Sequence, residues 1–419
     1  MENYKSRPLI TFVFFVGLFS AIYGPKVFGV LDLMVLVPFF LIVILISASH
    51  NFIKAEKYLF FLIGISSFIF FQLLAFNLFE NINDPYFLLR TTRSFFSEIL
   101  IFILFYSITK RGWISHKTVV DLITIVFLIG AFVVYIQAFF PQTQSIFAGL
   151  WGFDKRFLYF RAFGMSAGYD TTGYLLSWAA AFLMLYWFRF RYTSSFLAFL
   201  FVAGAVMFTS RTSMVMLIAL CGLSVLLSKS YYKFFSFANI ILISTGVFFV
   251  YFFIYPVIAA SIFNNDGGAI IFGGVVNERF ATTDILKTVT HHYVVPDTLY
   301  GNLFGLGYSP KVDPGYFITI FKGGGLLLGT FLFFYVFSLF YVYKSYKNIK
   351  HYAVSVSQRQ WIEIWMAAIF LMLVVIVIGN FKNFYFFTRG FHEFFVFLIA
   401  VALGFSHKAK ISIKDGAYL

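Results

Sequence analysis

The chain has 419 residues, of which 61% are hydrophobic and only 11% are charged, and its formal net charge is +14. Soluble globular domains carry about 25% charged residues, so this composition excludes a protein that folds in water. The single cysteine, Cys221, excludes an intramolecular disulfide and a thiolate metal cluster. The sequence therefore predicts an all-α, polytopic membrane protein.

Twelve apolar runs approach or reach the ~20 residues that a helix needs to cross ~30 Å of hydrocarbon. They are residues 8–23, 27–48, 58–78, 87–109, 119–140, 174–188, 195–208, 212–228, 234–258, 316–343, 361–378 and 391–405. The first run follows a basic N-terminus, but no small-x-small cleavage site follows it cleanly. We therefore expect a retained helix there rather than a signal peptide.

The basic residues test this count, because short cytoplasmic loops of membrane proteins are enriched in Lys and Arg. With both termini in the cytoplasm, the two tails and the short inner loops hold more than half of the 31 Lys and Arg residues. Those loops are residues 49–57, 110–117, 189–193, 229–233 and 344–359. This asymmetry favours twelve spans, and attraction to anionic lipid accounts for the net charge without a nucleic-acid partner.

The long polar segments all fall on the opposite, extracytoplasmic face. They are residues 79–86, 141–172 and, longest of all, 259–314. Long loops without secondary structure are usually functional. We therefore expect one transmembrane domain, residues 1–419, whose active face is the one that carries the large loop 259–314 and the second outer loop 141–172.

Six arginines lie in the outer half, against the topological rule: Arg90, Arg93, Arg161, Arg211, Arg279 and Arg389. A guanidinium group binds diphosphate or carboxylate through two parallel hydrogen bonds, whereas the alternative is snorkelling to lipid phosphates. Arg211, in "FTSRTSM", lies in a tight turn between two predicted helices, which places it near the bundle. Arg90 and Arg93 are three residues apart and share one helix face.

The acidic candidates are Asp32, Glu98, Asp313 and Glu393. Asp32 and Glu98 lie in apolar runs, and we expect them to pair with arginines. His291 and His292, in the large loop, are candidate bases or sugar contacts, or else solvated surface residues. No metal-ligand spacing, Walker-type phosphate loop or Asp-x-Asp pair is present.

Asp313 precedes Pro314, as Asp84 precedes Pro85, and an Asp-Pro pair is a helix-start signal. Asp313 is therefore either a helix cap or a functional carboxylate at the mouth of the bundle. Gly323, Gly324 and Gly325 follow within the predicted helix, where each glycine costs ~1 kcal/mol relative to alanine. Close helix approach offsets that cost in lipid, or the glycines form a groove for a ligand chain.

Three stretches carry a family resemblance: "NLFGLGYSPKVDPGYFITIFKGGGLLLG", "FTSRTSMVMLIA" and "RFLYFRAFGMSAGYDTTGYLL". With their order, their placement and the predicted spans, the chain resembles the Wzy-type O-antigen and surface-polysaccharide polymerases, relatives of the O-antigen ligases. In the ligase branch a histidine stands where this chain has Asp313, which favours the polymerase.

The resemblance implies a GT-C-like glycosyltransferase of the bacterial inner membrane that needs no metal or cofactor and works at the periplasmic face. It would transfer a growing glycan from one undecaprenyl diphosphate carrier to the sugar end of another lipid-linked repeat unit, with a chain-length regulator as candidate partner. Asp313, as the base, with Arg211 and Arg279 would be catalytic. Arg161, Arg90, Arg93, Arg389, His291, His292 and Tyr316 would bind substrate.

Two alternatives stay open. An O-antigen ligase would share the fold and deliver glycan to lipid A core. A flippase for lipid-linked oligosaccharide would show related halves and discontinuous helices near the midplane of the membrane.

Overall fold

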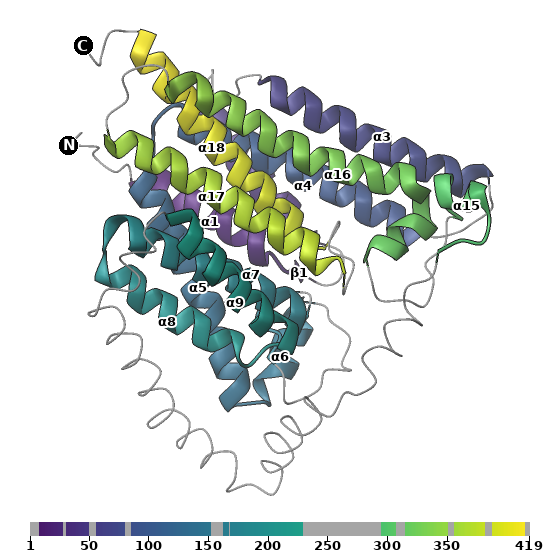
Figure 1. Cartoon of the computed structure of the whole chain (residues 1–419), viewed down its shortest axis with the longest axis horizontal. Helices are drawn as coiled ribbons and strands as arrows, with labels where there is room; N and C mark the ends of the chain where they lie inside the picture. Colours follow the sequence, from purple (N-terminus) through teal and green to yellow (C-terminus); the bar gives the residue numbers. More distant parts are fainter. Residues whose placement is uncertain are drawn as a thin grey trace, which may run out of the picture.

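The computed structural model describes residues 8–27, 31–49, 56–79, 85–151, 162–166, 168–228, 295–306, 315–350, 356–381 and 388–414. Within these ranges the chain is almost entirely helical (Figure 1). The helices are α1 (Pro8–Tyr23), α2 (Leu33–Ala48), α3 (Lys57–Phe79), α4 (Pro85–Lys110), α5 (His116–Phe139), α6 (Thr143–Trp151), α7 (Tyr169–Phe190), α8 (Thr193–Val206), α9 (Arg211–Ser228), α15 (Leu299–Phe304), α16 (Gly315–Lys350), α17 (Val356–Gly379) and α18 (Phe391–Lys414). Two short strands, β1 (Lys26–Val27) and β2 (Leu31–Asp32), pair antiparallel between α1 and α2.

Five of the described helices, α3, α5, α16, α17 and α18, are long and apolar enough to cross a membrane. Four shorter apolar helices, α1, α2, α8 and α9, accompany them. The fold is thus compatible with a helical membrane protein. A helix lies within each predicted apolar run except the ninth, residues 234–258, which lies outside the described residues. In the second run, residues 27–48, the helix begins only at Leu33, after the strands β1 and β2. The number of spans stays a prediction.

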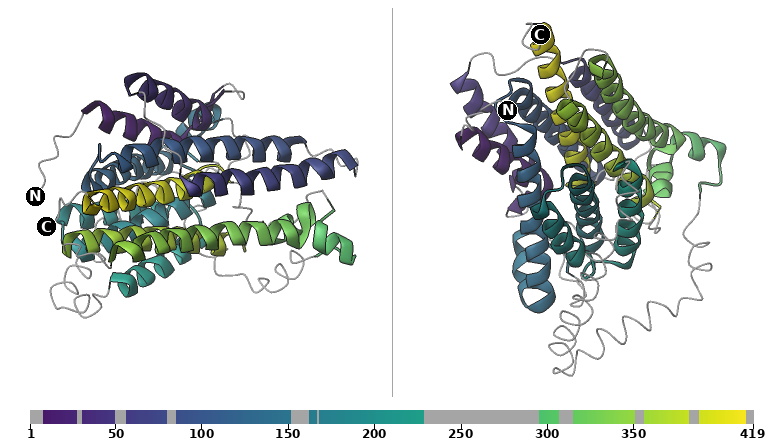
Figure 2. Two further views of the ribbon diagram at one scale, coloured as in Figure 1. Left: turned by 90° about the horizontal axis from the view of Figure 1, so that it is seen from above. Right: turned by 60° about the vertical axis from the view of Figure 1, so that its left-hand side comes forward.

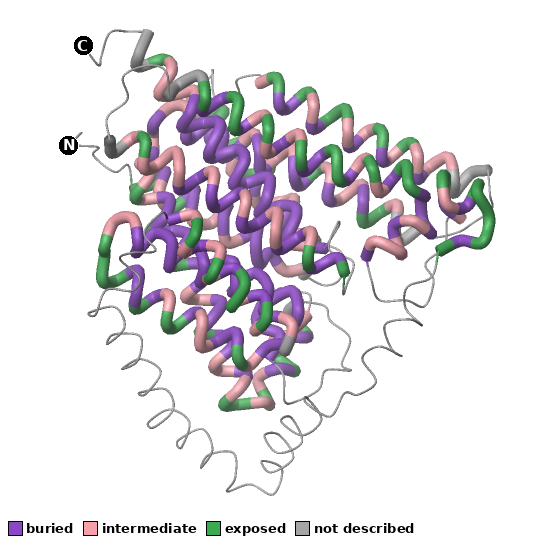
Figure 3. The backbone as a smooth tube through the Cα atoms, viewed as in Figure 1, coloured by how far each residue is buried: buried purple, intermediate pink, exposed green. Residues whose placement is uncertain are grey.

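Helix α18 forms the centre of the bundle and packs against α4, α16, α17 and α1. Its residues 391–406 are all buried, as the continuous purple tube in Figure 3 shows. Apart from His392, Glu393 and Ser406, these residues are apolar or glycine on every side, which is typical of a helix in a bundle interior. By contrast, α3 and α16 expose large apolar side chains, such as Phe60 and Phe333, on their outer faces. In a membrane these faces contact lipid. Helix α1 begins and α18 ends at the same end of the bundle (Figure 2).

Two local predictions about the chain path can be compared with the structure. The turn between α8 and α9 is confirmed, although Arg211 is the first residue of α9 rather than part of the turn. Pro85 is the first residue of α4, as its position after Asp84 predicts. The segment 141–172, which is predicted as an outer loop, contains the helix α6 and the first residues of α7.

The glycine triplet interrupts α16 instead of continuing it. Gly323 and Gly324 have non-helical backbone angles, and Gly324 has a φ of 67°, which side-chain-bearing residues rarely adopt. A Cβ atom on Gly324 would lie 2.2 Å from the carbonyl oxygen of Leu303, at the end of α15. Gln72 of α3 donates a hydrogen bond to the Gly323 carbonyl at 2.9 Å. The expected close approach is therefore present, but it is made through a helix break.

Candidate functional site

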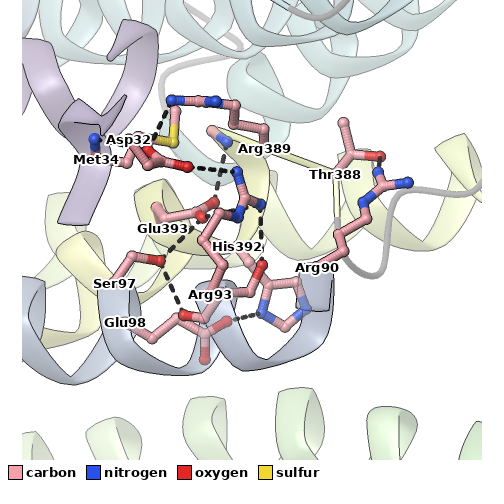
Figure 4. A network of polar contacts seen from close by, with 12 residues as sticks. Asp32, Met34, Arg90, Arg93, Ser97, Glu98, Thr388, Arg389, His392 and Glu393 are labelled. Atoms are coloured by element: carbon pink, nitrogen blue, oxygen red, sulfur yellow. Dashed lines mark hydrogen bonds and ion pairs between the residues drawn. The ribbon is translucent and has the colours of Figure 1, made fainter. Parts of the chain in front are cut away.

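Six ionisable side chains gather where α2 and α18 begin, about halfway along α4 (Figure 4). We call them the charged cluster: Asp32, Arg93, Glu98, Arg389, His392 and Glu393. They come from three chain segments that are far apart in sequence. Burying charge in a bundle is costly unless each charge meets a partner, so the pairing within this cluster defines its chemistry.

Asp32 joins the start of α2 to two arginines. Its Oδ1 atom accepts the backbone N–H of Met34 at 2.9 Å and so caps the helix. The same oxygen accepts a hydrogen bond from Arg389 at 2.7 Å, and Oδ2 lies 3.3 Å from Nη1 of Arg93. The side chain is 12% exposed. One carboxylate therefore fixes a helix start and neutralises guanidinium groups from α4 and from the turn before α18.

Glu393 plays the matching role at the start of α18 and is fully buried. Its Oε2 accepts the backbone N–H of Gly390 at 2.9 Å, the return contact of a capping box. Its Oε1 accepts the hydroxyl of Ser97 at 3.1 Å and lies 3.8 Å from Nη2 of Arg93. Arg93 thus lies between the carboxylates of Asp32 and Glu393.

Arg389 approaches the cluster from the turn that precedes α18. In addition to Asp32, its guanidinium donates to the backbone carbonyl of Gly24, just after α1. Burial lowers the pKa of Arg389 from its ordinary value, and the negative charge of Asp32 opposes this effect. The arginine therefore ties the ends of α1, α2 and α18 together as a charged group.

Glu98 and His392 form the deepest part of the cluster. Oε1 of Glu98 lies 3.1 Å from Nδ1 of His392, and both side chains are at most 5% exposed. Nε2 of His392 is hydrogen-bonded to the hydroxyl of Tyr335 on α16. The three groups form a carboxylate–imidazole–phenol series, an arrangement that can accept and pass on a proton.

A small cavity adjoins this series, and an open groove lies beside it. The cavity, about 20 Å³, has space for about one water molecule and is lined by Glu98 and His392 together with Ser66 and Thr91. The groove, about 450 Å³, runs between α3 and α16 on the outer face of the bundle and is lined by Gly64, Ile65, Phe68, Gly325, Leu326, Gly329, Thr330 and Phe333. Ile65 lines both spaces. The groove is apolar because all but one of its side chains are aliphatic, aromatic or absent.

The structure brings together part of the predicted site. Arg93 and Arg389 meet in the charged cluster, whereas exposed Arg90 points away from it, toward Thr388, with Nη2 3.5 Å from the hydroxyl oxygen (Figure 4). Tyr316 lies apart, at the start of α16, where its hydroxyl donates to the carbonyl of Val377 on α17. Only the backbone of Arg211 is described. Arg161, Arg279, His291, His292 and Asp313 lie outside the described residues.

The predicted pairing of acidic residues with arginines is confirmed for Asp32. Glu98, however, has a histidine as its ion-pair partner within 4 Å, because His392 occupies the adjacent face of α18. Sequence reasoning missed His392 and Tyr335. The signal was present for His392, since a histidine next to a glutamate inside an apolar run is a buried ionisable pair. The sequence contains no such signal for Tyr335, because nothing distinguishes it from the other tyrosines among the 26 in the chain.

No family model, no curated protein and no solved structure matches this chain. Its assignment therefore rests on its own residues: a helical protein compatible with a membrane, in which a buried charged cluster adjoins an apolar groove.

Proposed function

We propose that this protein is a polymerase of lipid-linked oligosaccharide repeat units, which moves a growing glycan from one undecaprenyl diphosphate carrier to the sugar end of another. The observation that carries the proposal is the adjacency of two unlike surfaces. Arginine side chains gather at one level of α4, and the apolar groove between α3 and α16 lies next to the cavity of the same cluster. A prenyl diphosphate has two parts that complement these surfaces, an apolar chain for the groove and an anion for the arginines.

The groove has the chemistry of a site for the prenyl chain. Beyond the backbone of their own helix and their chain neighbours, Gly64 and Gly329 have no atom within 4 Å of the position that a Cβ would occupy, so there is open space beside both helices. The outer faces of Phe68 and Phe333 are exposed. An aliphatic chain that entered the groove from water would gain about 25 cal/mol per Å² of apolar surface buried. A chain that entered it from lipid would gain only packing contacts.

The arginines would neutralise the diphosphate as the sugar leaves it. In the transfer, the acceptor hydroxyl attacks the anomeric carbon, the bond from that carbon to the diphosphate oxygen breaks, and a base takes the hydroxyl proton. Arg211 and Arg279 would stabilise charge on the leaving oxygen, with Arg161, Arg90, Arg93 and Arg389 binding the carrier. Asp313 remains the proposed base, and Tyr316, His291 and His292 remain proposed sugar contacts.

Deletion of the gene in the bacterium that carries it, followed by gel analysis of the surface glycan, tests this proposal. We expect long chains to disappear while single capped repeats remain, because only polymerisation stops. Loss of every repeat would contradict polymerisation and indicate ligation or flipping.

Complementation with Arg90→Ala sharpens the test, because Arg90 is exposed and its removal leaves the charged cluster in place. We expect the variant to insert normally and to make mostly single repeats. Arg359→Ala is the matched control, since that arginine is 58% exposed at the other end of the bundle. Long chains at the normal level in Arg90→Ala would remove this arginine from the substrate site.

A flippase for the same lipid-linked oligosaccharide is the second candidate, and the break in α16 is the observation that favours it. Interrupted helices are typical of transporter sites at the middle of the membrane. Here Gly323 is only the ninth residue of a 36-residue helix, and the break is filled by α15. That position, near one helix end, favours the polymerase.

A further inference from the structure

Polar residues form a stripe along the inner face of α16. Tyr335, Ser338, Tyr341 and Ser345 follow one another at intervals of three or four residues, which places them on one side of the helix. Each contacts a polar group from another segment of the chain. Tyr335 and Ser338 are essentially inaccessible to solvent. The stripe therefore runs through the bundle rather than along its surface.

The stripe begins at the charged cluster. The hydroxyl of Tyr335 is hydrogen-bonded to His392, whose other ring nitrogen faces Glu98. One turn further along α16, the hydroxyl of Ser338 is 2.6 Å from that of Tyr58 on α3. Tyr58 is also fully buried. Four segments of the bundle thus supply ionisable or hydroxyl groups in close succession.

The stripe leads to a second group at the other end of the same helices, which we call the tyrosine cluster: Glu56, Tyr106, Tyr341 and His407. The rings of Tyr58 and Tyr341 are in contact, with centroids 5.6 Å apart. Tyr341 and Tyr106 donate hydrogen bonds to the two oxygens of Glu56, at 2.8 and 2.9 Å. The Tyr106 hydroxyl is also 2.8 Å from Nδ1 of His407.

The two clusters are separated by most of the thickness of a membrane. His392 and His407 lie on the same straight helix, about four turns or about 22 Å apart, compared with ~30 Å for the hydrocarbon of a bilayer. Lysines stand at the far end, where Lys110 donates to the Tyr106 hydroxyl and Lys410 to the Ser345 hydroxyl. The polar groups therefore link two charged regions through an otherwise apolar interior.

Maintaining such a line of groups is costly. Each buried hydroxyl must find a hydrogen-bond partner, and phenylalanine or alanine would pack there without that requirement. Chains of acidic residues and histidines inside membrane bundles are typical of proton pathways. The stripe resembles such a pathway, because its hydroxyls lie between two clusters that contain carboxylates and imidazoles.

We propose that this stripe conducts protons between the two faces of the protein. A hydroxyl accepts a proton on one side and releases its own on the other, so no group changes its charge after a complete transfer. His392 and Glu98 exchange protons with Tyr335 at one end, and Glu56, Tyr106 and His407 do so at the other. Two steps, from Tyr335 to Ser338 and from Tyr58 to Tyr341, require a bridging water.

The test uses the purified full chain in liposomes that contain a pH-sensitive dye, with a potassium diffusion potential as the driving force. We expect proton uptake well above that of protein-free liposomes. Tyr335→Phe and Ser338→Ala remove one hydroxyl each and should lower the rate about tenfold or more, because a proton relay has no detour within an apolar interior. No sugar substrate is needed, so this activity and glycan polymerisation fail independently.

Tyr346→Phe is the matched control. Tyr346 is also buried on α16, but its hydroxyl donates to the backbone carbonyl of Ala402, away from the path. The Tyr346→Phe variant should take up protons at the wild-type rate. Uptake no faster than in protein-free liposomes would overturn the proposal. Wild-type rates in both Tyr335→Phe and Ser338→Ala, or an equal loss in Tyr346→Phe, would do the same. If Tyr335→Phe fails to fold, as judged by size-exclusion chromatography, Ser338→Ala decides.

Discussion

The charged cluster and the tyrosine cluster use the same helices in different ways. Each contains at least one carboxylate group and one histidine of α18, His392 or His407. In the charged cluster, Asp32 and Glu393 face guanidinium groups and cap helix starts. In the tyrosine cluster, the carboxylate of Glu56 accepts from two phenol hydroxyls and lies 3.4 Å from Nδ1 of His407. Guanidinium groups only donate hydrogen bonds, whereas hydroxyls both donate and accept. The carboxylate–arginine pairs of the first cluster therefore fix charge in place, whereas the hydroxyls of the second can rearrange.

Glu393→Gln should show the largest effect, because it places an amide opposite donors that need a carboxylate. Gly390 N–H, the Ser97 hydroxyl and Arg93 all direct hydrogen toward this buried group. Breaking a buried ion pair costs about 3–5 kcal/mol. We expect a destabilisation of that order, measured as a shift of the SDS-unfolding midpoint in mixed micelles.

Glu363→Gln is the control for that variant. Glu363 also pairs with arginines, including Arg189 at 2.8 Å, but its side chain is 28% exposed. Partly exposed pairs contribute about 0–1 kcal/mol. Equal shifts for Glu393→Gln and Glu363→Gln would show that the charged cluster is not sealed from solvent as its burial indicates.

Substitutions of Asp32 should cause an intermediate loss of stability, which has two separable contributions. Asp32→Asn keeps an N-cap for α2 and removes the negative charge that faces Arg93 and Arg389, whereas Asp32→Ala removes both. Loss of an N-cap costs about 1 kcal/mol. In the same unfolding assay, we expect Asp32→Asn to be less stable than the wild type. We expect Asp32→Ala to be less stable than Asp32→Asn by about 1 kcal/mol. Wild-type stability in Asp32→Asn would mean that the arginine pairs contribute nothing.

Most helix positions could be predicted from the sequence because they depend on local apolar runs, whereas α6 and α15 lie in segments that are predicted as loops. The pairing of Asp32 with arginines also followed from local evidence, since an isolated carboxylate in an apolar run needs a cation. The hairpin before α9 followed from the short polar turn around Ser210. Each of these features is decided by a few neighbouring residues or by the cost of burying one group.

The site itself depended on contacts that no local pattern shows. His392 meets Glu98, almost three hundred positions earlier in the chain, and Tyr335 becomes notable only through its contact with His392. Likewise, the glycines of α16 were expected within a continuous helix. They break it because α15 packs against the gap, with Leu303 occupying the space where a Cβ of Gly324 would lie. Tertiary packing, and not the local sequence, determines these contacts and the position of the helix break.

Glu56→Gln makes the same chemical change in the tyrosine cluster and should have the smallest effect on stability. The two oxygens of Glu56 each accept from a different hydroxyl, those of Tyr341 and Tyr106. In the glutamine variant, the amide oxygen still accepts from one hydroxyl, and the amide N–H group donates to the other, which turns to accept. The net change for such an exchange is about 1 kcal/mol.

The unfolding midpoint of Glu56→Gln should therefore shift much less than that of Glu393→Gln. A shift as large as that of Glu393→Gln would mean that the hydroxyls around Glu56 are held as rigidly as the guanidinium groups. In that case the contrast between a fixed and a rearrangeable cluster would be wrong. The small shift, by contrast, requires hydroxyls that reverse their donor and acceptor roles, which is the same motion that proton transfer along α16 demands.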